Sequence, residues 1–208
     1  MPTRVIDVGK SFDDKVRLYE PEQGSTGDWI ALTHPWGNGP HFSTTRQNVD
    51  AHKIGIDFSS LPATFRDAIT VTRTLGQQYL WIDSLCIIQG PDGDFNKEAK
   101  LMEEVYSGAY CVIAASRATG HDSGFLKPRL KREVVALRRK DASSSGLFYV
   151  CGLVDDFQAQ VLDGALNRRA WVMQEHALAR RTIFFTDHQT YWECGQGVRC
   201  ETMMSMSK

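Results

Sequence analysis

The sequence predicts an α/β fold: a mainly parallel sheet with helices on both faces, plus an added β-hairpin and helical insertion. Three apolar runs, within residues 29–33, 79–88 and 110–115, have the composition of buried strands. Amphipathic patterns typical of helices separate them, at residues 61–76 and 95–108. Strands that alternate with helices in this way indicate a parallel sheet covered on both faces.

The first elements surround a loop of unusual composition. Residues 4–20 alternate weakly and predict two short strands. The strand at 29–32 leads into the loop Thr33–Pro40, which contains two prolines, two glycines, a tryptophan and a histidine. Such a loop can be a decorated turn or a ligand-binding loop, and both interpretations stay open.

The helices of the central part have clear boundaries. Pro62 suits the first turn of the first helix, and Gly76 suits its end. Gly90–Asp94 is a strong turn signal ahead of the second helix.

Beyond residue 117 the pattern loosens. The basic run 127–132 is interpreted as a solvated edge. The remaining segments predict an added hairpin (133–137 with 147–153), helices at 155–166 and 168–180, and strands at 182–186 and 190–194. We expect one domain over residues 1–208, with its core at about 27–200.

Composition narrows the class of protein. The chain has 208 residues, 42% of them hydrophobic, and a formal net charge of −1. This charge favours neither nucleic acid nor an acidic membrane surface as a partner. The longest apolar run is too short to span a bilayer, and the N-terminus lacks the apolar stretch of a signal peptide. We therefore expect a soluble, cytoplasmic protein.

The five cysteines predict neither a disulfide framework nor a metal site. Cys86, Cys111 and Cys151 lie within apolar runs, while Cys194 and Cys200 lie in a glycine-containing tail. The number is odd, and the CxxC and paired-histidine spacings of zinc sites are missing.

Asp83 and Ser84 interrupt the apolar run Tyr79–Gln89 with a charge and a hydroxyl. A buried carboxylate must be paired or lie at an open strand end, and ligands of α/β sheets bind at the carboxyl ends of strands. The alternative is that Asp83 caps a turn after a short strand.

Trp171 and Glu175 are four residues apart in a predicted helix. This spacing places the indole and the carboxylate on one helical face, where they could bind a flat ligand. The alternative is a core tryptophan beside a solvated glutamate.

Taken together, seven segments resemble the fungal heterokaryon-incompatibility (HET) domain: Pro2–Asp7, Leu32–Gly37, Leu61–Ile69, Tyr79–Gln89, Met102–Ala109, Gly124–Leu126 and Arg169–Glu175. The run Trp-Ile-Asp-Ser-Leu-Cys-Ile-Ile-Gln is the most specific of them. The family usually has Ser-His-Cys-Trp-Gly where this chain has Thr-His-Pro-Trp-Gly, so Pro35 replaces the cysteine. That replacement argues against a required nucleophile at this position.

The HET resemblance implies a cell-death effector of fungal non-self recognition, and the HET domain in turn resembles Toll/interleukin-1 receptor (TIR) domains. Catalytic TIR domains cleave NAD to nicotinamide and ADP-ribose. By this resemblance Glu175 is the catalytic carboxylate, and NAD is a substrate rather than a bound cofactor. The residues expected to line the nucleotide pocket are Thr33, His34, Trp36, Gly37, Asp83, Ser84 and Trp171.

Two other functions remain open. One is a non-enzymatic signalling module that self-associates or binds a sensor protein, in which Glu175 is a surface residue. The other is a thiol enzyme that uses Cys86 beside His34, although an apolar setting would raise the pKa of that thiol.

Overall fold

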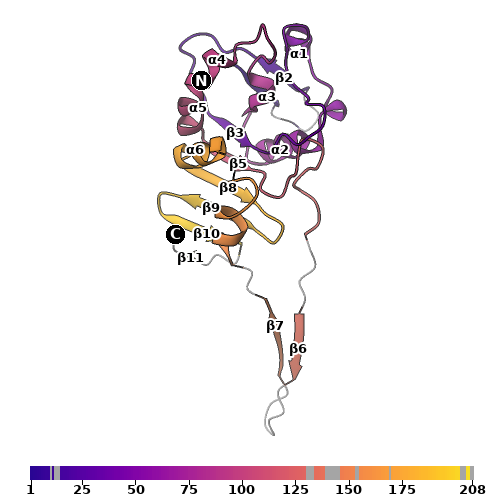
Figure 1. The fold of residues 1–208 in the computed structure, drawn as a ribbon, viewed down its shortest axis with the longest axis vertical. Helices are drawn as coiled ribbons and strands as arrows, with labels where there is room; N and C mark the ends of the chain where they lie inside the picture. The colour runs from indigo at the N-terminus through magenta and orange to yellow at the C-terminus, as the bar shows by residue number, and fades with distance from the viewer. Residues whose placement is uncertain are drawn as a thin grey trace.

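The computed structural model describes residues 1–9, 11, 15–129, 134–138, 146–152, 155–168, 170–201 and 205–206. Their strands form a nine-stranded sheet in the order β11-β10-β9-β8-β5-β3-β4-β1-β2 and a separate two-stranded sheet, β6-β7. Figure 1 shows the large sheet and its helices as one body, from which β6 and β7 project.

The centre of the large sheet is parallel. β3 (Trp29–Thr33) pairs in parallel with β4 (Tyr79–Trp81) and with β5 (Cys111–Ala114), and β5 pairs in parallel with β8 (Arg181–Phe185). Every residue of β5 is buried, as its apolar composition predicts. The predicted neighbourhood of the three apolar runs is therefore confirmed.

The flanks of the sheet are antiparallel. β1 (Val5–Asp7) pairs with β4 and with β2 (Arg17–Tyr19). On the other side, β9 (Thr190–Cys194) follows β8 as a hairpin. The sheet then continues through β10 (Gly197–Cys200) and β11 (Ser205–Met206).

Two sequence-based expectations are corrected. The predicted strand 79–88 ends at Trp81, and α3 (Asp83–Cys86) is a single helical turn. A buried helical turn has the same apolar composition as a buried strand, so the pattern did not separate them. The tail between Cys194 and Cys200 contains β10, because a two-residue turn at Gly195 and Gln196 reverses the chain and returns it along β9.

The remaining elements are mostly helical. They are α1 (Val49–Ile54), η1 (Phe58–Ser60), α2 (Ala63–Thr74), α4 (Phe95–Glu98), η2 (Ala99–Leu101), α5 (Met102–Gly108), η3 (Gln158–Leu162) and α6 (Ala170–Leu178). α2, the α4–α5 stretch and α6 confirm predicted helices, whereas α1 and η1 were not predicted. The helix expected at 155–166 is mainly the π-helical turn η3.

The helices lie on both faces of the large sheet, as the right-handedness of crossover connections requires. The chain moves one way across the sheet from β3 to β4 and the opposite way from β4 to β5 and on to β8. Right-handed crossovers therefore place α2 on one face and both α5 and α6 on the other. Figure 1 shows this arrangement, and α5 packs against α6.

β6 (Val134–Arg138) and β7 (Leu147–Cys151) form the predicted hairpin. The described residues include no helix that is both long and apolar enough to cross a membrane.

Candidate functional site

A cavity of about 250 Å³ opens where β3 and β4 end. Its lining comes from the loop after β3, from α3 and the loop after it, and from α4, α5 and α6. The lining residues are Leu32, Thr33, His34, Trp36, Asp83, Ile87, Gln89, Phe95, Met102, Tyr106, Val172 and Glu175.

The topology explains why a cavity forms there. The connection that leaves β3 runs through α2 on one face toward β4, and the connection that leaves the adjacent strand β5 runs through α6 on the other face toward β8. Two adjacent parallel strands whose connections diverge leave a crevice outside their carboxyl ends, which is where open α/β sheets bind ligands.

Trp36 and Asp83 join the two loops at the mouth of this crevice. The Trp36 indole Nε1 donates a hydrogen bond of 2.7 Å to Asp83 Oδ2. The other carboxylate oxygen, Oδ1, accepts from the backbone N–H of Ser84 at 2.7 Å. Asp83 is therefore fixed by donors on both oxygens, and it is the first residue of the turn α3.

Gln89 holds the far end of α3. Its side-chain amide donates to the carbonyl oxygens of Asp83 (3.3 Å) and Ile87 (3.0 Å). Its backbone N–H donates to the carbonyl oxygen of Thr44 at 2.7 Å. The loop after β3 and the loop after β4 are thus connected on both sides of the cavity.

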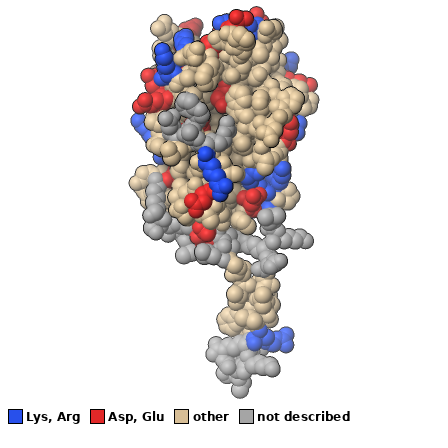
Figure 2. All heavy atoms as spheres, viewed as in Figure 1, with Lys and Arg blue, Asp and Glu red and all other residues tan. Residues whose placement is uncertain are grey.

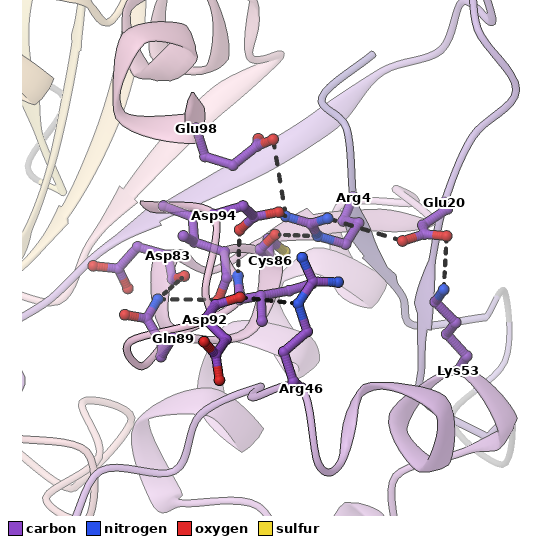
Figure 3. Close-up of polar contacts among 12 residues, drawn as sticks. Arg4, Glu20, Arg46, Lys53, Asp83, Cys86, Gln89, Asp92, Asp94 and Glu98 are labelled. Atoms are coloured by element: carbon purple, nitrogen blue, oxygen red, sulfur yellow. Dashed lines mark hydrogen bonds and ion pairs between the residues drawn. The ribbon is translucent and has the colours of Figure 1, made fainter. Parts of the chain in front are cut away.

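A buried arginine braces the loop beneath α3 (Figure 3). Arg4, 5% exposed, donates to the carbonyl oxygen of Cys86 at 2.7 Å and pairs with Asp94 at 2.5 Å. Asp94 in turn accepts from the backbone N–H of Ile88 at 2.8 Å. Gly93 fits because a Cβ there would lie 2.1 Å from the carbonyl oxygen of Ile88. Arg4, the residue that precedes β1, therefore helps to set the shape of the site.

His34 lines the cavity and belongs to a buried cluster of aromatic rings. Its ring centroid is 5.2 Å from that of Phe65 and 5.1 Å from that of His121. The loop after β5 brings His121 there, because the Asp67 carboxylate accepts from the backbone N–H groups of Phe125 (2.6 Å) and Leu126 (2.9 Å).

Burial lowers the pKa of His121 to about 4, with further contributions from His34 and His41, while Asp122 opposes the shift. The side chain is 3% exposed, and within the described part of the chain neither ring nitrogen has a hydrogen-bond partner. His121 is therefore neutral at physiological pH.

This histidine predicts a pH-dependent stability. An unfolded histidine has a pKa of about 6.5, so between pH 6.5 and 4 the unfolded chain binds a proton that the folded chain does not. The free energy of unfolding should therefore fall as the pH drops through this window, by up to about 3 kcal/mol from this residue. His121→Phe should lose this component of the slope in urea unfolding measured at several pH values. If His121→Phe shows the same pH dependence of the free energy of unfolding as the wild type, groups other than His121 cause that dependence.

Glu175 enters the cavity from the opposite side. It lies on α6 and is 8% exposed, and it also lines an adjacent cavity with Lys100 and Glu103. The next residue anchors the helix, because His176 Nε2 lies 2.5 Å from Glu193 Oε2 on β9. This contact fixes the rotation of α6, so that Glu175 points toward the end of β3.

The structure brings together most of the predicted site. Thr33, His34, Trp36, Asp83 and Glu175 line one cavity. Ser84 is fully buried and does not line it, and neither does Gly37. The role of Gly37 is structural, because its φ is 81° and a Cβ would lie 3.0 Å from the Cα of Gly120. The side chain of Trp171 lies outside the described residues.

Several lining residues were not predicted from sequence. Phe95, Met102 and Tyr106 lie in the segment 95–108, where the sequence pattern predicts only a helix, and all three line the cavity. Gln89 closes the apolar run that begins at Tyr79, and no local pattern indicates that its side-chain amide holds α3. His121 stands alone in a glycine-containing loop, and no local pattern indicates its burial.

Cys86 faces the core and not the cavity. It is 1% exposed, its sulfur accepts from the backbone N–H of Ile82 at 3.4 Å, and burial raises its pKa to about 12. A thiol in this setting is not a nucleophile at neutral pH, which counts against a thiol enzyme.

Thiol labelling tests whether Cys86 is unreactive in the folded protein. A maleimide should modify the exposed Cys151 of the native protein within minutes, while Cys86 reacts only after denaturation. Peptide mass spectrometry reads out both sites in one sample. Rapid native labelling of Cys86 would reopen the thiol-enzyme hypothesis.

The fold and the cavity define an α/β protein with a crevice at the carboxyl ends of its central strands, where proteins of this class bind ligands. A family model described as Heterokaryon incompatibility protein (HET) matches residues 29–175, from the first residue of β3 to Glu175. The chain belongs to this family. All residues that line the cavity lie within the match, whereas Arg4 lies outside it. Comparisons with curated proteins and with solved structures give no match.

Proposed function

We propose that this HET domain hydrolyses NAD to nicotinamide and ADP-ribose, and that it acts as a cell-death effector of fungal non-self recognition. One observation carries the catalytic part of the proposal. The nearly buried carboxylate of Glu175 shares a cavity with Trp36 and Asp83 at the carboxyl ends of β3 and β4.

The chemistry needs one well-placed carboxylate. The bond between the ribose C1′ and the nicotinamide nitrogen breaks, and its electron pair leaves with nicotinamide, which is neutral and needs no proton. The ribose becomes oxocarbenium-like and adds water at C1′, which releases a proton and gives ADP-ribose. A carboxylate beside the ribose stabilises the developing positive charge, and low exposure strengthens that interaction.

The lining residues suit the other parts of the substrate. In this proposal Trp36 stacks on the nicotinamide ring, held in place by its hydrogen bond to Asp83. His34 and Thr33 close the end of the cavity beneath it. A volume of about 250 Å³ accommodates the nicotinamide and ribose rather than the whole dinucleotide, so the adenosine half would extend outward.

The test is to incubate the purified chain with NAD and to quantify nicotinamide and ADP-ribose by chromatography. The proposal predicts equal amounts of the two products, increasing with time and with protein concentration. If no nicotinamide forms at any protein concentration, the enzymatic proposal fails.

The competing proposal is a signalling module without catalysis. The observation that favours it is an apolar hairpin that projects from the body of the protein. In this case the protein would signal by assembly, and NAD would remain intact.

A further inference from the structure

A second cavity, of about 410 Å³, adjoins the first along α6. Both cavities are lined by Met102, Tyr106 and Glu175. Along α6, Val172 lines the first cavity, Glu175 lines both, and Leu178 lines the second. The helix rises by about 9 Å from Val172 to Leu178, so the two cavities follow one another over that length. Glu175 therefore lies at their junction.

The first cavity is too small to hold a dinucleotide. Its volume of about 250 Å³ lies below the range of about 300 to 1,000 Å³ that is usual for ligand sites, and the second cavity brings the combined space within that range. The proposed reaction places the ribose that loses nicotinamide beside Glu175. The remainder of the dinucleotide must leave the first cavity from there, and the second cavity begins at the same residue.

Lys100 gives the second cavity a cation. The described residues that line the first cavity include the carboxylates of Asp83 and Glu175 but no lysine or arginine, although a dinucleotide carries two phosphates. Lys100 lies on η2, is exposed and lines the second cavity. Within the described residues its ammonium group has no ion-pair partner. An unpaired lysine at the rim of a cavity is suited to bind a diphosphate.

Glu103 gives the same cavity a carboxylate, one helical turn after Lys100. Figure 2 shows acidic and basic groups close together over α4 and α5, so this surface carries charges of both signs. A carboxylate accepts hydrogen bonds from the hydroxyls of a ribose, and it repels a phosphate attached to that ribose. The two charges therefore suit a ligand that has a diphosphate beside an unmodified ribose.

The walls of the second cavity are suited to a flat base. Ala99 and Met102 lie on one side, and Ala177 and Leu178 lie on α6. α5 packs against α6, so the cavity lies between two helices, which is a common position for a ligand site. Aliphatic side chains can pack on both faces of a purine, and a methionine adapts its shape to the ring.

We propose that the second cavity is the subsite for the ADP half of the dinucleotide, with Lys100 on the diphosphate and Glu103 on the hydroxyls of the adenosine ribose. The protein therefore uses NAD in preference to NADP, because the 2′-phosphate of NADP would meet the carboxylate of Glu103. This inference rests on the proposed function, and it assigns the part of NAD that the first cavity does not hold.

Calorimetric titration of ADP-ribose and of ADP-ribose 2′-phosphate tests the subsite, because both ligands contain the ADP half and neither has a nicotinamide to lose. The wild type should bind ADP-ribose at least about tenfold more tightly than its 2′-phosphate. Lys100→Met should weaken the binding of ADP-ribose at least about fivefold, as expected for a partly exposed ionic contact. Glu103→Gln should reduce the preference over the 2′-phosphate to about threefold or less, since it removes the repelling charge.

The matched controls make the same changes of charge outside the two cavities. Lys97→Met on α4 and Glu104→Gln on α5 alter exposed residues that line neither cavity, and both should bind as the wild type does. All four variants should keep the melting temperature of the wild type, because the substituted side chains are exposed. The proposal is overturned if Lys100→Met and Glu103→Gln bind like their controls, or if the wild type does not bind ADP-ribose.

Kinetics separate this inference from the proposed function. Lys100→Met should raise the KM for NAD by the factor seen in binding and leave kcat unchanged, which is the signature of uniform binding. Its KM for nicotinamide riboside, which lacks the diphosphate and the adenosine, should equal that of the wild type. NAD cleavage with an unchanged KM in Lys100→Met would refute the subsite and leave the hydrolysis standing. Lys100-dependent binding of ADP-ribose without any release of nicotinamide from NAD would refute the hydrolysis and support the subsite.

Discussion

Glu175→Gln should reduce the rate of nicotinamide release from NAD by at least about a hundredfold, because it removes the charge that stabilises an oxocarbenium-like transition state. The amide keeps the shape of the side chain, so the cavity and the packing of α6 should be preserved. The loss should appear in kcat, since the charge is needed most in the transition state.

The matched control is Glu104→Gln, which neutralises an exposed carboxylate on α5 that does not line the cavity. Its turnover should stay within about twofold of the wild type, as is usual for surface substitutions away from a site. Melting temperatures of both variants should match that of the wild type. Full activity in Glu175→Gln would remove Glu175 from the mechanism.

Arg4→Met should cost about 3 to 5 kcal/mol of unfolding free energy, the largest stability effect that we expect from one substitution. It removes the cation from a buried group in which Asp94 lies 2.5 Å and Glu98 3.9 Å from the guanidinium. The side chain of Glu98 is 5% exposed, so its charge would be left without compensation. For a chain of this size the melting temperature should fall by roughly 10 °C.

The control lies a short distance away in the same network (Figure 3). Lys53 pairs with Glu20 at 2.8 Å, with exposed fractions of 37% and 43%. Lys53→Met should cost at most about 1 kcal/mol, because exposed ion pairs contribute little. Urea unfolding of the two variants gives the comparison directly, and equal losses would show that burial is not what makes the Arg4 group stabilising.

The central strands could be predicted from the sequence because a strand that is buried on both faces is a continuous apolar run. β3 and β5 are continuous apolar runs, and the helices between them have one apolar stripe each. For residues 79–88 the composition predicts one strand, whereas the strand ends at Trp81 and a helical turn follows. A buried turn of helix needs the same apolar residues as a strand, and four residues are too few to show a helical period.

Some residues of the candidate site could likewise be predicted from the local sequence, and others could not. Asp83 interrupts an apolar run and Glu175 stands in a helical spacing, so both could be proposed from local sequence. His121 could not, because its burial depends on Thr64 and Asp67, more than fifty residues earlier in the chain. Thr64 donates to the carbonyl oxygen of Gly120 at 2.8 Å, and Asp67 holds Phe125. Contacts of that range follow from the tertiary fold and leave no periodic pattern.

The central claim is that the cavity beside Trp36 and Glu175 is a nucleotide site. Calorimetric titration of NAD into Glu175→Gln tests it most directly, because the variant can bind the substrate without consuming it. The account predicts one NAD per chain. Adding Trp36→Ala removes the stacking surface and should lower the affinity about five- to tenfold, which corresponds to about 1 to 1.4 kcal/mol for an aromatic contact. No binding, or binding that Trp36→Ala leaves unchanged, would contradict it.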